Sequence, residues 1–422
     1  MKYNKEIIKE KAEYCLNCKT KPCTKGCPLQ NNIPDFIKYI KEEKYEEAFL
    51  ILKETTVFEP ICGRICPHKK QCEGSCVRGI KGKSVSIGEL ETFIGDYMLE
   101  QKEAQKVNVK NINKKVAIIG SGPAGLACAY LLSQNGFQVT IYEKHSKAGG
   151  LLRYGIPDFR LDKKILDQWL EKFILNKNIN ILFNKELGKD IQINEIKENY
   201  DCIVLAFGSN KSKKMNIPGD NLDIVLGGNE LLEYKNMPNF REKKIAVIGG
   251  GNVAIDSART IKKLGADSVK IIYRRTEEEM PAEEKEIQEA KKEKIDFLFK
   301  TNILKIFKDG KNGKIECINT KLVHKENENR KNPINIENSN YVIDIDYVIM
   351  AIGSTADKCI TDKLNVKKDE NGYIIVDETF KTSDPQIYAI GDLSGYRQTV
   401  AWAARSGFES AKTIIEKDLK WK

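Results

Sequence analysis

The sequence is poor in the residues that hydrolytic and membrane chemistry require. Its 422 residues include only three His and three Trp. Three histidines leave no obvious His-based hydrolytic site. No apolar run approaches the roughly 20 residues of a membrane-spanning helix, and the first six residues lack the apolar stretch of a secretory signal. We therefore expect a cytoplasmic protein that does not act at a membrane.

The charge balance also lacks a strong bias. The 70 Lys+Arg residues exceed the 60 Asp+Glu residues by ten, and this excess is spread along the whole chain. Binding to nucleic acid needs a focused basic stripe, and none is present. The sequence therefore predicts no nucleic-acid partner, whereas a basic face toward an acidic protein remains compatible with it.

Cysteine is abundant, and it is concentrated in one region. Eight of the 12 cysteines lie between Cys15 and Cys76. Cytosolic proteins rarely keep structural disulfides, so dense and regularly spaced cysteines indicate metal binding. The other four are scattered among apolar residues and are predicted to be buried packing residues: Cys128, Cys202, Cys317 and Cys359.

The spacing of the eight cysteines favours iron–sulfur clusters. The first run is Cys15-x2-Cys18-x4-Cys23-x3-Cys27-Pro28, and the second is Cys62-x3-Cys66-Pro67-x4-Cys72-x3-Cys76. Runs that end in Cys-Pro are typical of [4Fe–4S] binding. Two zinc sites are the alternative, but zinc sites usually pair two C-x2-C knuckles and only one is present.

A glycine-rich loop follows the first predicted strand, at residues 116–119. It has the pattern G-x-G-x-x-G, and a helix over 124–135 and a strand over 138–142 come next. The glycines allow a tight turn, a close approach to a pyrophosphate, and close packing of helix on strand. Glu143, at the end of the second strand, is placed to accept hydrogen bonds from ribose hydroxyls. The predicted binding residues are Gly120, Gly122, Pro123, Ala124, Gly125 and Glu143.

The same texture repeats from residue 243, with strands over 245–248 and 269–273 around a helix over 253–264. The loop residues are Gly249, Gly251, Asn252, Val253 and Ala254. At the position of Glu143 this module has Arg274, followed by Arg275. An arginine fork binds a 2′-phosphate, which an acid would repel. The second module is therefore predicted to prefer NADPH over NADH.

Two dinucleotide modules imply two dinucleotides, most simply a flavin and a nicotinamide cofactor. Gly391 and Asp392 follow a late apolar strand, where the acid suits a ribityl hydroxyl, and a small-residue helix follows over 401–411. Gly353 follows another late strand and is added to the predicted binding residues. Neither module contains a Cys-x-x-Cys, so no disulfide linked to the flavin is expected.

These patterns predict an α/β fold with two Rossmann-like dinucleotide-binding domains, preceded in the sequence by an all-α iron–sulfur domain. The NADPH domain is expected to be inserted into the FAD domain. A polar linker is predicted over 101–113. The predicted boundaries are 1–108 for the helical domain, 114–235 and 351–422 for the two parts of the FAD domain, and 236–350 for the NADPH domain.

The order of motifs resembles the small (β) subunit of NADPH-dependent glutamate synthase and the N-terminal half of dihydropyrimidine dehydrogenase. The resemblance spans essentially the whole chain and rests on residues 15–28, 62–67, 72–76, 149–157 and 249–256. It implies FAD in the first module, NADPH in the second and two [4Fe–4S] clusters. Within the matching strings it adds Gly150 and Leu151 to the predicted flavin site.

The resemblance also implies a crossed pattern of cluster ligands. One cluster would be held by Cys15, Cys18, Cys23 and Cys76. The other would be held by Cys27, Cys66, Cys72 and an oxygen ligand that aligns best with Glu91. Glu89 and Thr92 are the neighbouring alternatives for that ligand, and Cys62 would not be a ligand.

The function expected from these features is electron transfer without a catalytic side chain, since the cofactors carry the redox chemistry. NADPH would reduce FAD, and the clusters would carry single electrons to a partner in a hetero-oligomer. That partner is expected to be a glutamate synthase large subunit, or a ferredoxin-like carrier as in ferredoxin:NADP⁺ transhydrogenases. A third hypothesis is an electron-transfer module without substrate turnover of its own. The chain has no room for a glutamine-hydrolysing site and an FMN-bearing barrel.

Overall fold

The computed structural model describes residues 3–101, 111–175, 178–234, 237–310, 312–324, 330–395 and 398–419. The chain forms two compact units. The first comprises Met1–Arg153, Asp158–Ser209 and Ala356–Lys422, and the second comprises Tyr154–Pro157 and Asn210–Thr355. Most of the linker predicted at 101–113 lies outside the described residues.

The N-terminal region is helical, as the spacing of its apolar residues predicts. In α3, the side chains of Ile33, Phe36, Ile37 and Ile40 lie on one face and are at most 2% exposed. Pro34 stands in the first turn, where its missing N–H is harmless. The helices are α1 (Lys5–Glu13), α2 (Pro22–Gly26), α3 (Ile33–Lys41), α4 (Tyr45–Lys53), α5 (Glu59–Ile65) and α6 (Ile87–Glu100).

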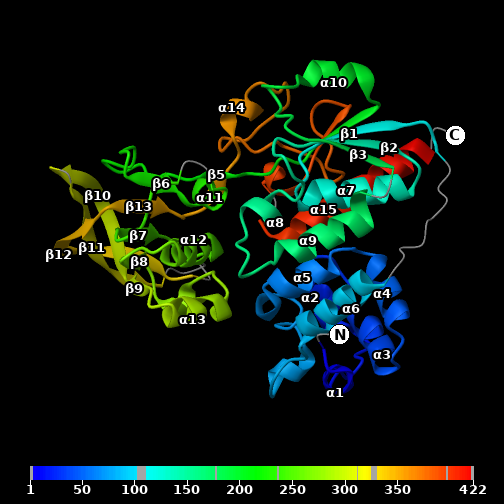
Figure 1. Ribbon diagram of the computed structural model, residues 1–422, viewed down its shortest axis with the longest axis horizontal. Helices are drawn as coiled ribbons and strands as arrows, with labels where there is room; N and C mark the ends of the chain where they lie inside the picture. The colour runs from blue at the N-terminus through cyan, green and yellow to red at the C-terminus, as the bar shows by residue number, and fades with distance from the viewer. Residues whose placement is uncertain are drawn as a thin grey trace. The chain divides into compact units, whose positions relative to one another are not determined.

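A five-stranded parallel sheet forms the other half of the first unit, in the order β15-β4-β1-β2-β3. Its strands are β1 (Lys115–Ile119), β2 (Gln138–Tyr142), β3 (Ile179–Leu182), β4 (Cys202–Leu205) and β15 (Ile387–Ala389), and α10 (Ile193–Asn199) precedes β4. Helices α7 (Pro123–Gln134) and α15 (Val400–Leu419) lie side by side (Figure 1). They approach closely because Gly407 has no side chain: a Cβ there would lie 2.2 Å from the Ala124 carbonyl.

The helical region and the sheet region share one core. Trp169, in α9 (Lys163–Leu170), is fully buried and donates its indole N–H to the Val57 carbonyl. The Trp169 ring also packs on Phe58, with ring centroids 4.6 Å apart. Arg405 of α15 donates to the Pro28 carbonyl at 3.0 Å. The N-terminal helices therefore pack firmly on the first dinucleotide module.

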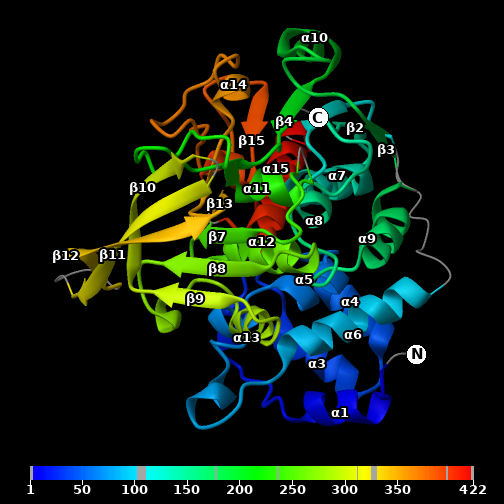
Figure 2. The same ribbon diagram turned by 60° about the vertical axis from the view of Figure 1, so that its left-hand side comes forward.

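The second unit repeats the parallel arrangement, with sheet order β6-β13-β7-β8-β9. Figure 2 shows β7, β8 and β9 side by side. The strands are β6 (Val225–Gly227), β7 (Lys244–Ile248), β8 (Ser268–Tyr273), β9 (Asp296–Phe299) and β13 (Tyr347–Met350), and the helices are α11 (Gly228–Leu232), α12 (Asn252–Lys263) and α13 (Glu284–Lys292). Apolar side chains cover both faces of the sheet: Val247 and Ile271 pack on one face, and Ile248 and Ile272 pack on the other.

An antiparallel sheet also belongs to the second unit. It consists of β10 (Thr301–Asp309), β11 (Asn312–Val323) and β12 (Asn332–Ile345). Its polar residues lie on one exposed face, while Ile303, Ile315 and Cys317 pack on the other. Alternation of this kind is usual in half-exposed antiparallel strands.

The domain boundary predicted at 235/236 differs from the structure. The second unit already begins at Asn210, because β6 joins its sheet and β5 (Lys211–Ser212) pairs with β14 (Ser354–Thr355). Strands of two or three residues leave no periodic signal in the sequence. The unit ends at Thr355, close to the predicted 350/351.

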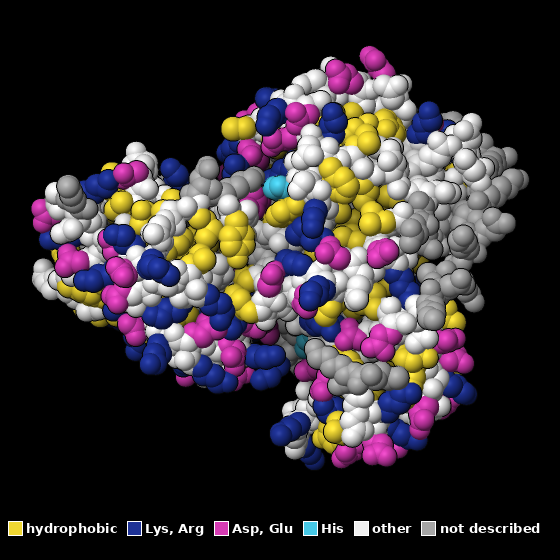
Figure 3. Space-filling model, viewed as in Figure 1, with side chains coloured by type: hydrophobic (Ala, Val, Ile, Leu, Met, Phe, Trp, Pro, Cys, Tyr) yellow, Lys and Arg dark blue, Asp and Glu magenta, His cyan; other side chains and the backbone are white. Residues whose placement is uncertain are grey.

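The four scattered cysteines differ in their burial. Cys128, Cys202 and Cys317 are buried as predicted, but the prediction for Cys359 is wrong because it is exposed at the start of α14 (Lys358–Thr361). On the face shown in Figure 3, basic and acidic side chains are interspersed. No helix within the described ranges is both long and apolar enough to cross a membrane.

Candidate functional site

The first glycine-rich loop connects β1 to α7, and two of its three glycines have no room for a side chain. Gly120 has φ +107°, and a Cβ there would lie 2.7 Å from the Ala206 carbonyl. At Gly125 a Cβ would lie 2.1 Å from the Gly120 carbonyl, so the third glycine is required for helix–strand packing. A Cβ at Gly122, by contrast, would meet nothing closer than 3.9 Å. That open space beside the start of α7, where Pro123 and Ala124 stand, fits a pyrophosphate.

Glu143 lies at the end of β2 and is 3% exposed. One carboxylate oxygen accepts from the Ser121 N–H at 3.0 Å and from its hydroxyl, and the other accepts from the His145 N–H at 2.8 Å. The carboxylate is thus fixed against the glycine loop. Its position at the carboxyl end of β2 is where an acid binds ribose hydroxyls in this kind of module.

The turn at Gly149 and Gly150 closes over the same loop. The Gly149 N–H donates to the Ser121 carbonyl at 3.1 Å, and Gly150 has φ +50°. A Cβ at Gly150 would lie 2.6 Å from the Gly122 Cα. Leu151 follows, partly exposed, at the start of α8 (Leu151–Tyr154).

Gly391 and Asp392 reach the loop from the distant C-terminal segment. Gly391 has φ +66°, its N–H donates to the Ser406 hydroxyl at 2.9 Å, and a Cβ on it would lie 3.0 Å from the Ala124 side chain. Desolvation raises the pKa of Asp392 to about 7. Within the described residues its carboxyl group has no hydrogen-bond partner, which fits a group that awaits a ligand hydroxyl.

The second glycine-rich loop connects β7 to α12 in the second unit. Gly249 has φ +141°, and a Cβ there would lie 2.2 Å from the Ala351 carbonyl. The Asn252 side chain accepts from the Glu283 N–H at 3.0 Å, and Ala254 packs under the turn at the start of α12, next to Val253. Gly251 has open space beside it, as Gly122 does. Gly353 has φ +123° and lies beyond the end of β13 in the same unit.

The two arginines at the end of β8 have different environments. Arg274 is exposed, but Arg275 is only 8% exposed and donates its Nε–H to the Lys331 carbonyl at 2.9 Å. Arg274 faces solvent, whereas the Nε–H of Arg275 links β8 to the β11–β12 hairpin; that both arginines bind a ribose phosphate stays a prediction. No sequence pattern could indicate this contact, because it joins residues 56 positions apart.

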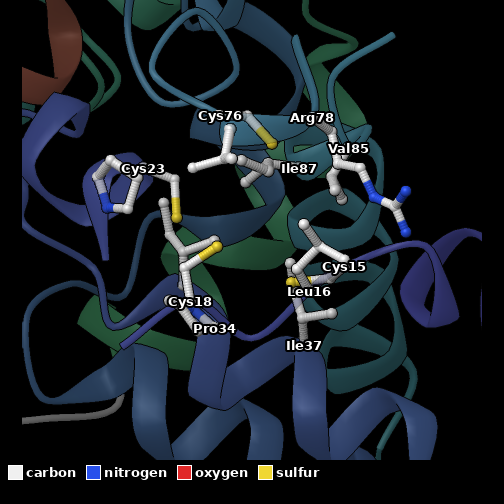
Figure 4. A pocket seen from close by; sticks show the side chains of 13 residues that line it. Cys15, Leu16, Cys18, Cys23, Pro34, Ile37, Cys76, Arg78, Val85 and Ile87 are labelled. Atoms are coloured by element: carbon white, nitrogen blue, oxygen red, sulfur yellow. The ribbon is translucent and has the colours of Figure 1, made fainter. Parts of the chain in front are cut away.

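Four of the predicted cluster ligands line one cavity in the helical region. Cys15, Cys18 and Cys23 come from the segment around α2, and Cys76 comes from the second cysteine run (Figure 4). The rest of the wall is largely apolar and includes Ile33, Ile37, Val85 and Ile87. The structure thus brings together the set that the resemblance assigns to the first cluster, across more than 50 residues of sequence.

The other four predicted ligands are also neighbours. Burial raises the pKa of the Cys27 thiol to about 12, and the nearby charge of Glu91 acts in the same direction. Burial, followed by the charges of Cys27, Glu91 and Cys66, raises the pKa of Cys72. Buried thiols of this kind become thiolates when a metal compensates the charge. Cys62 is buried beside them, and its thiol hydrogen-bonds to Cys66.

The environment of Glu91 distinguishes it from its neighbours in sequence. Glu91 is 5% exposed and burial raises its pKa to about 8, whereas Glu89 is exposed and pairs with Lys11. The Thr92 hydroxyl donates to the Gly88 carbonyl of its own helix. Of the three candidates, Glu91 is therefore the one directed into the protein among the cysteines.

Two residues beside Glu91 were not predicted from the sequence. The Asn31 amide donates to Glu91 at 3.2 Å and accepts from the Thr55 hydroxyl at 2.7 Å. His68, which as a loop residue beside cysteines would be expected in solvent, lies 4.0 Å from Glu91. Burial lowers the pKa of His68 to about 4, so it is neutral near pH 7. Neither residue belongs to a recognisable motif.

The spacing of the thiols bears on the choice between clusters and zinc. Within the ranges that the structure describes, no three His, Cys, Asp or Glu side chains converge on a point that could hold one ion. Zinc draws its sulfur ligands to about 2.3 Å, whereas a four-iron cluster holds its thiolates at separate corners of a larger body. The largely apolar cavity lined by four thiols suits a cluster, whose irons are bound by cysteine thiolates.

Comparisons with known proteins agree with this architecture. Residues 114–407 match the family model described as pyridine nucleotide-disulphide oxidoreductase. Residues 1–103 match the model for dihydropyrimidine dehydrogenase domain II, 4Fe-4S cluster. These matches assign FAD and NAD(P) to the dinucleotide modules and [4Fe–4S] chemistry to the helical region.

Individual relatives cover most of the chain. It is 33% identical to the glutamate synthase [NADPH] small chain of Escherichia coli, over 96% of this chain and 90% of that protein. It is 33% identical to the NADP(+)-dependent formate dehydrogenase subunit beta of Moorella thermoacetica, over 94% of this chain but only 59% of that protein.

A solved structure supports the fold. FprA of Mycobacterium tuberculosis in complex with NADPH matches with a TM-score of 0.65 and 19% identity, over 73% of this chain and 85% of that chain. At this identity the match shows the fold alone. Together with the family matches and the site geometry, it shows that this chain belongs to the pyridine nucleotide-disulphide oxidoreductases, in the family of glutamate synthase small chains.

Proposed function

We propose that this protein takes reducing equivalents from NADPH and delivers them as single electrons to a partner protein through two [4Fe–4S] clusters. Bound FAD would accept a hydride, and the clusters would pass electrons one at a time. The protein's own residues bind and position these groups: the loop at 120–125 with Glu143 and Asp392 for FAD, and the loop at 249–254 with Arg274 for NADPH.

The observation that carries this proposal is the cavity lined by Cys15, Cys18, Cys23 and Cys76 in the same compact unit as the flavin-type loop. A disulfide-reducing enzyme of the same fold would need a cysteine pair beside the flavin. The eight clustered thiols lie instead in the helical region. They suit one-electron transfer away from the dinucleotides.

The two ligand sets differ in their surroundings. The Cys27 set lies beside Pro28, whose carbonyl is held by Arg405 of α15 in the flavin-type module. The Cys15 set lies near the surface, and its cavity is lined by Leu16 and Val77, which are 54% and 38% exposed. We therefore propose that electrons pass from the buried set to the exposed set and leave there.

The rim of the exposed set suggests the kind of partner. Ile80 is 78% exposed and lies close to Arg78, Lys81 and Lys83 in the sequence. An apolar patch with basic neighbours fits an acidic protein surface. A glutamate synthase large subunit is the proposed partner, by analogy with the E. coli relative. A ferredoxin-like carrier is the alternative, and the formate dehydrogenase relative illustrates other assemblies.

Iron analysis of anaerobically purified protein tests the number and ligands of the clusters. We expect about eight irons per chain, from two four-iron clusters. Cys27→Ser should reduce this to about four, whereas the matched variant Cys62→Ser should keep about eight because Cys62 is a buried neighbour and not a ligand. Stoichiometric zinc, or equal iron loss in both variants, would contradict the assignment.

Stopped-flow reduction tests the route. Cys15→Ser should leave bleaching of the flavin band by NADPH nearly unchanged, since the change lies in the helical region, but should abolish reduction of the physiological partner. The unmodified chain alone should reduce artificial dyes. If the variant reduces the partner at the unmodified rate, the clusters are not the route; if the unmodified chain reduces no dye, it is an electron-transfer module without turnover.

A further inference from the structure

A third arginine, Arg330, contacts the last residue of β8, although it belongs to no sequence motif. Arg330 lies where the β11–β12 hairpin returns to the sheet, and its Nη2 donates to the Tyr273 hydroxyl at 2.7 Å and to the Glu279 carbonyl. The Tyr273 ring packs against the glycine-rich loop: a Cβ at Gly250 would lie 2.6 Å from that ring. One tyrosine therefore separates Arg330 from the loop that faces the nucleotide.

The position of Arg330 is fixed by Arg275. The Arg275 Nε–H donates to the carbonyl of Lys331, the residue next to Arg330, and Arg275 is largely buried. The carbonyl of Arg275 in turn accepts from the Lys300 N–H at 2.9 Å, and the Thr320 hydroxyl donates to the Arg274 carbonyl at 2.9 Å. The Arg275 side chain thus links β8 to the β11–β12 hairpin by a hydrogen bond.

Arg274 and Arg330 are neighbouring positive charges. Partial desolvation, followed by the nearby charges of Arg275 and Arg330, lowers the pKa of Arg274. Within the part of the chain that the structure describes, the Arg274 guanidinium has no carboxylate partner. Of the acids that follow in sequence, Glu277 pairs with Lys291 and Glu279 accepts from the Thr276 N–H, while Glu278 lines the same pocket as Arg330.

We propose that Arg330 is a specificity-determining residue, and that it forms with Arg274 the pair that recognises the 2′-phosphate of NADPH. The ribose of a dinucleotide lies at the carboxyl end of the second strand of such a module, which here is β8. A phosphate dianion accepts several charge-assisted hydrogen bonds; Arg275 is largely buried with its Nε–H bound to the hairpin, whereas Arg274 and Arg330 are exposed. This inference rests on the proposed preference for NADPH and assigns that preference to a residue outside the Arg-Arg motif.

Titration calorimetry of the purified holoprotein with NADP⁺ and NAD⁺ tests the inference. Arg330→Gln should raise the Kd for NADP⁺ by about tenfold to a hundredfold, the range for losing hydrogen bonds to a charged group. The Kd for NAD⁺ should change by less than about twofold, since only the 2′-phosphate differs. Arg330→Lys should recover part of the loss, because it keeps the charge but not the fork.

Lys331→Gln is the matched control, because it removes the same charge from the next exposed position and keeps the backbone carbonyl that Arg275 uses. It should change either Kd by less than about twofold. Arg275→Gln removes the hydrogen bond that positions the segment of Arg330, so combining it with Arg330→Gln should add little to the effect of Arg330→Gln alone.

The outcomes separate the inference from the proposed function. If unmodified protein binds NADP⁺ and NAD⁺ equally, the proposed NADPH preference is wrong and this inference falls with it. If the unmodified protein prefers NADP⁺ but Arg330→Gln keeps the same ratio of the two Kd values, the preference stands and the role of Arg330 is refuted. Equal losses in Arg330→Gln and Lys331→Gln would also refute it, because they would show general electrostatics only.

Discussion

Replacing Trp169 should loosen the helical region from the flavin-type module. Trp169 is fully buried, its ring packs on Phe58, and its indole N–H satisfies the buried Val57 carbonyl. Trp169→Phe keeps an aromatic ring but leaves that carbonyl without its donor, which should lower the free energy of unfolding by about 1–3 kcal/mol. Trp169→Ala also opens a large cavity and should lower it by about 3–5 kcal/mol.

Urea unfolding followed by far-UV circular dichroism measures these losses in anaerobic holoprotein. The same variants should also slow electron transfer from the flavin to the clusters, because the helical region is held less firmly. The effect should be larger for Trp169→Ala than for Trp169→Phe. Phe297→Leu is the control: its ring stacks on Phe299 in the second unit, so it should affect stability without affecting that rate. If Trp169→Phe unfolds like the unmodified protein, the indole hydrogen bond does not hold the two regions together.

Two further predictions concern the flavin site. Asp392 has a raised pKa of about 7 in the folded protein, so its contribution to stability is present at low pH and is lost as the pH rises through 7. The free energy of unfolding of flavin-free protein should therefore fall by about 2–3 kcal/mol relative to that of Asp392→Asn between pH 5 and pH 8. Parallel pH profiles for the two proteins would contradict this. Gly125→Ala places a methyl group 2.1 Å from the Gly120 carbonyl and should destabilise the fold, whereas the methyl group of Gly122→Ala has room in the protein. Gly122→Ala should therefore keep its melting temperature but retain less flavin after gel filtration. Equal melting temperatures for the two variants would refute the assignment.

The parts of the site that sequence predicted well are those built from neighbouring residues. The loop at 120–125 is determined by one strand, one turn and one helix, so spacing alone located Gly120 and Gly125. The set Cys15, Cys18, Cys23 and Cys76 needed the family resemblance, because Cys76 joins the cavity from a distant segment. The spacing within each run could not have paired cysteines across the two runs.

The parts that sequence missed depend on contacts between distant segments. Arg275 and Arg274 are adjacent and chemically identical, yet only tertiary structure shows that the first binds the Lys331 carbonyl. Asn31 and Trp169 belong to no sequence motif either, since their side-chain hydrogen bonds join residues that are far apart in the sequence. Cys359 looked like a packing residue from its apolar neighbours, but burial depends on which face of α14 meets the core.

The interleaving of the two units has a consequence for how the protein is made on the ribosome. The first unit needs three segments, and its last strand and helix, β15 and α15, come after residue 386. The second unit is complete once Thr355 has emerged, because its short piece at 154–157 has been made by then. Synthesis therefore allows the later-starting unit to fold first, reversing the usual N-terminal-first order. Until α15 packs against α7, the unfinished first unit lacks this helix beside its glycine-rich loop. The Cys27 segment also lacks its hydrogen bond from Arg405 until then.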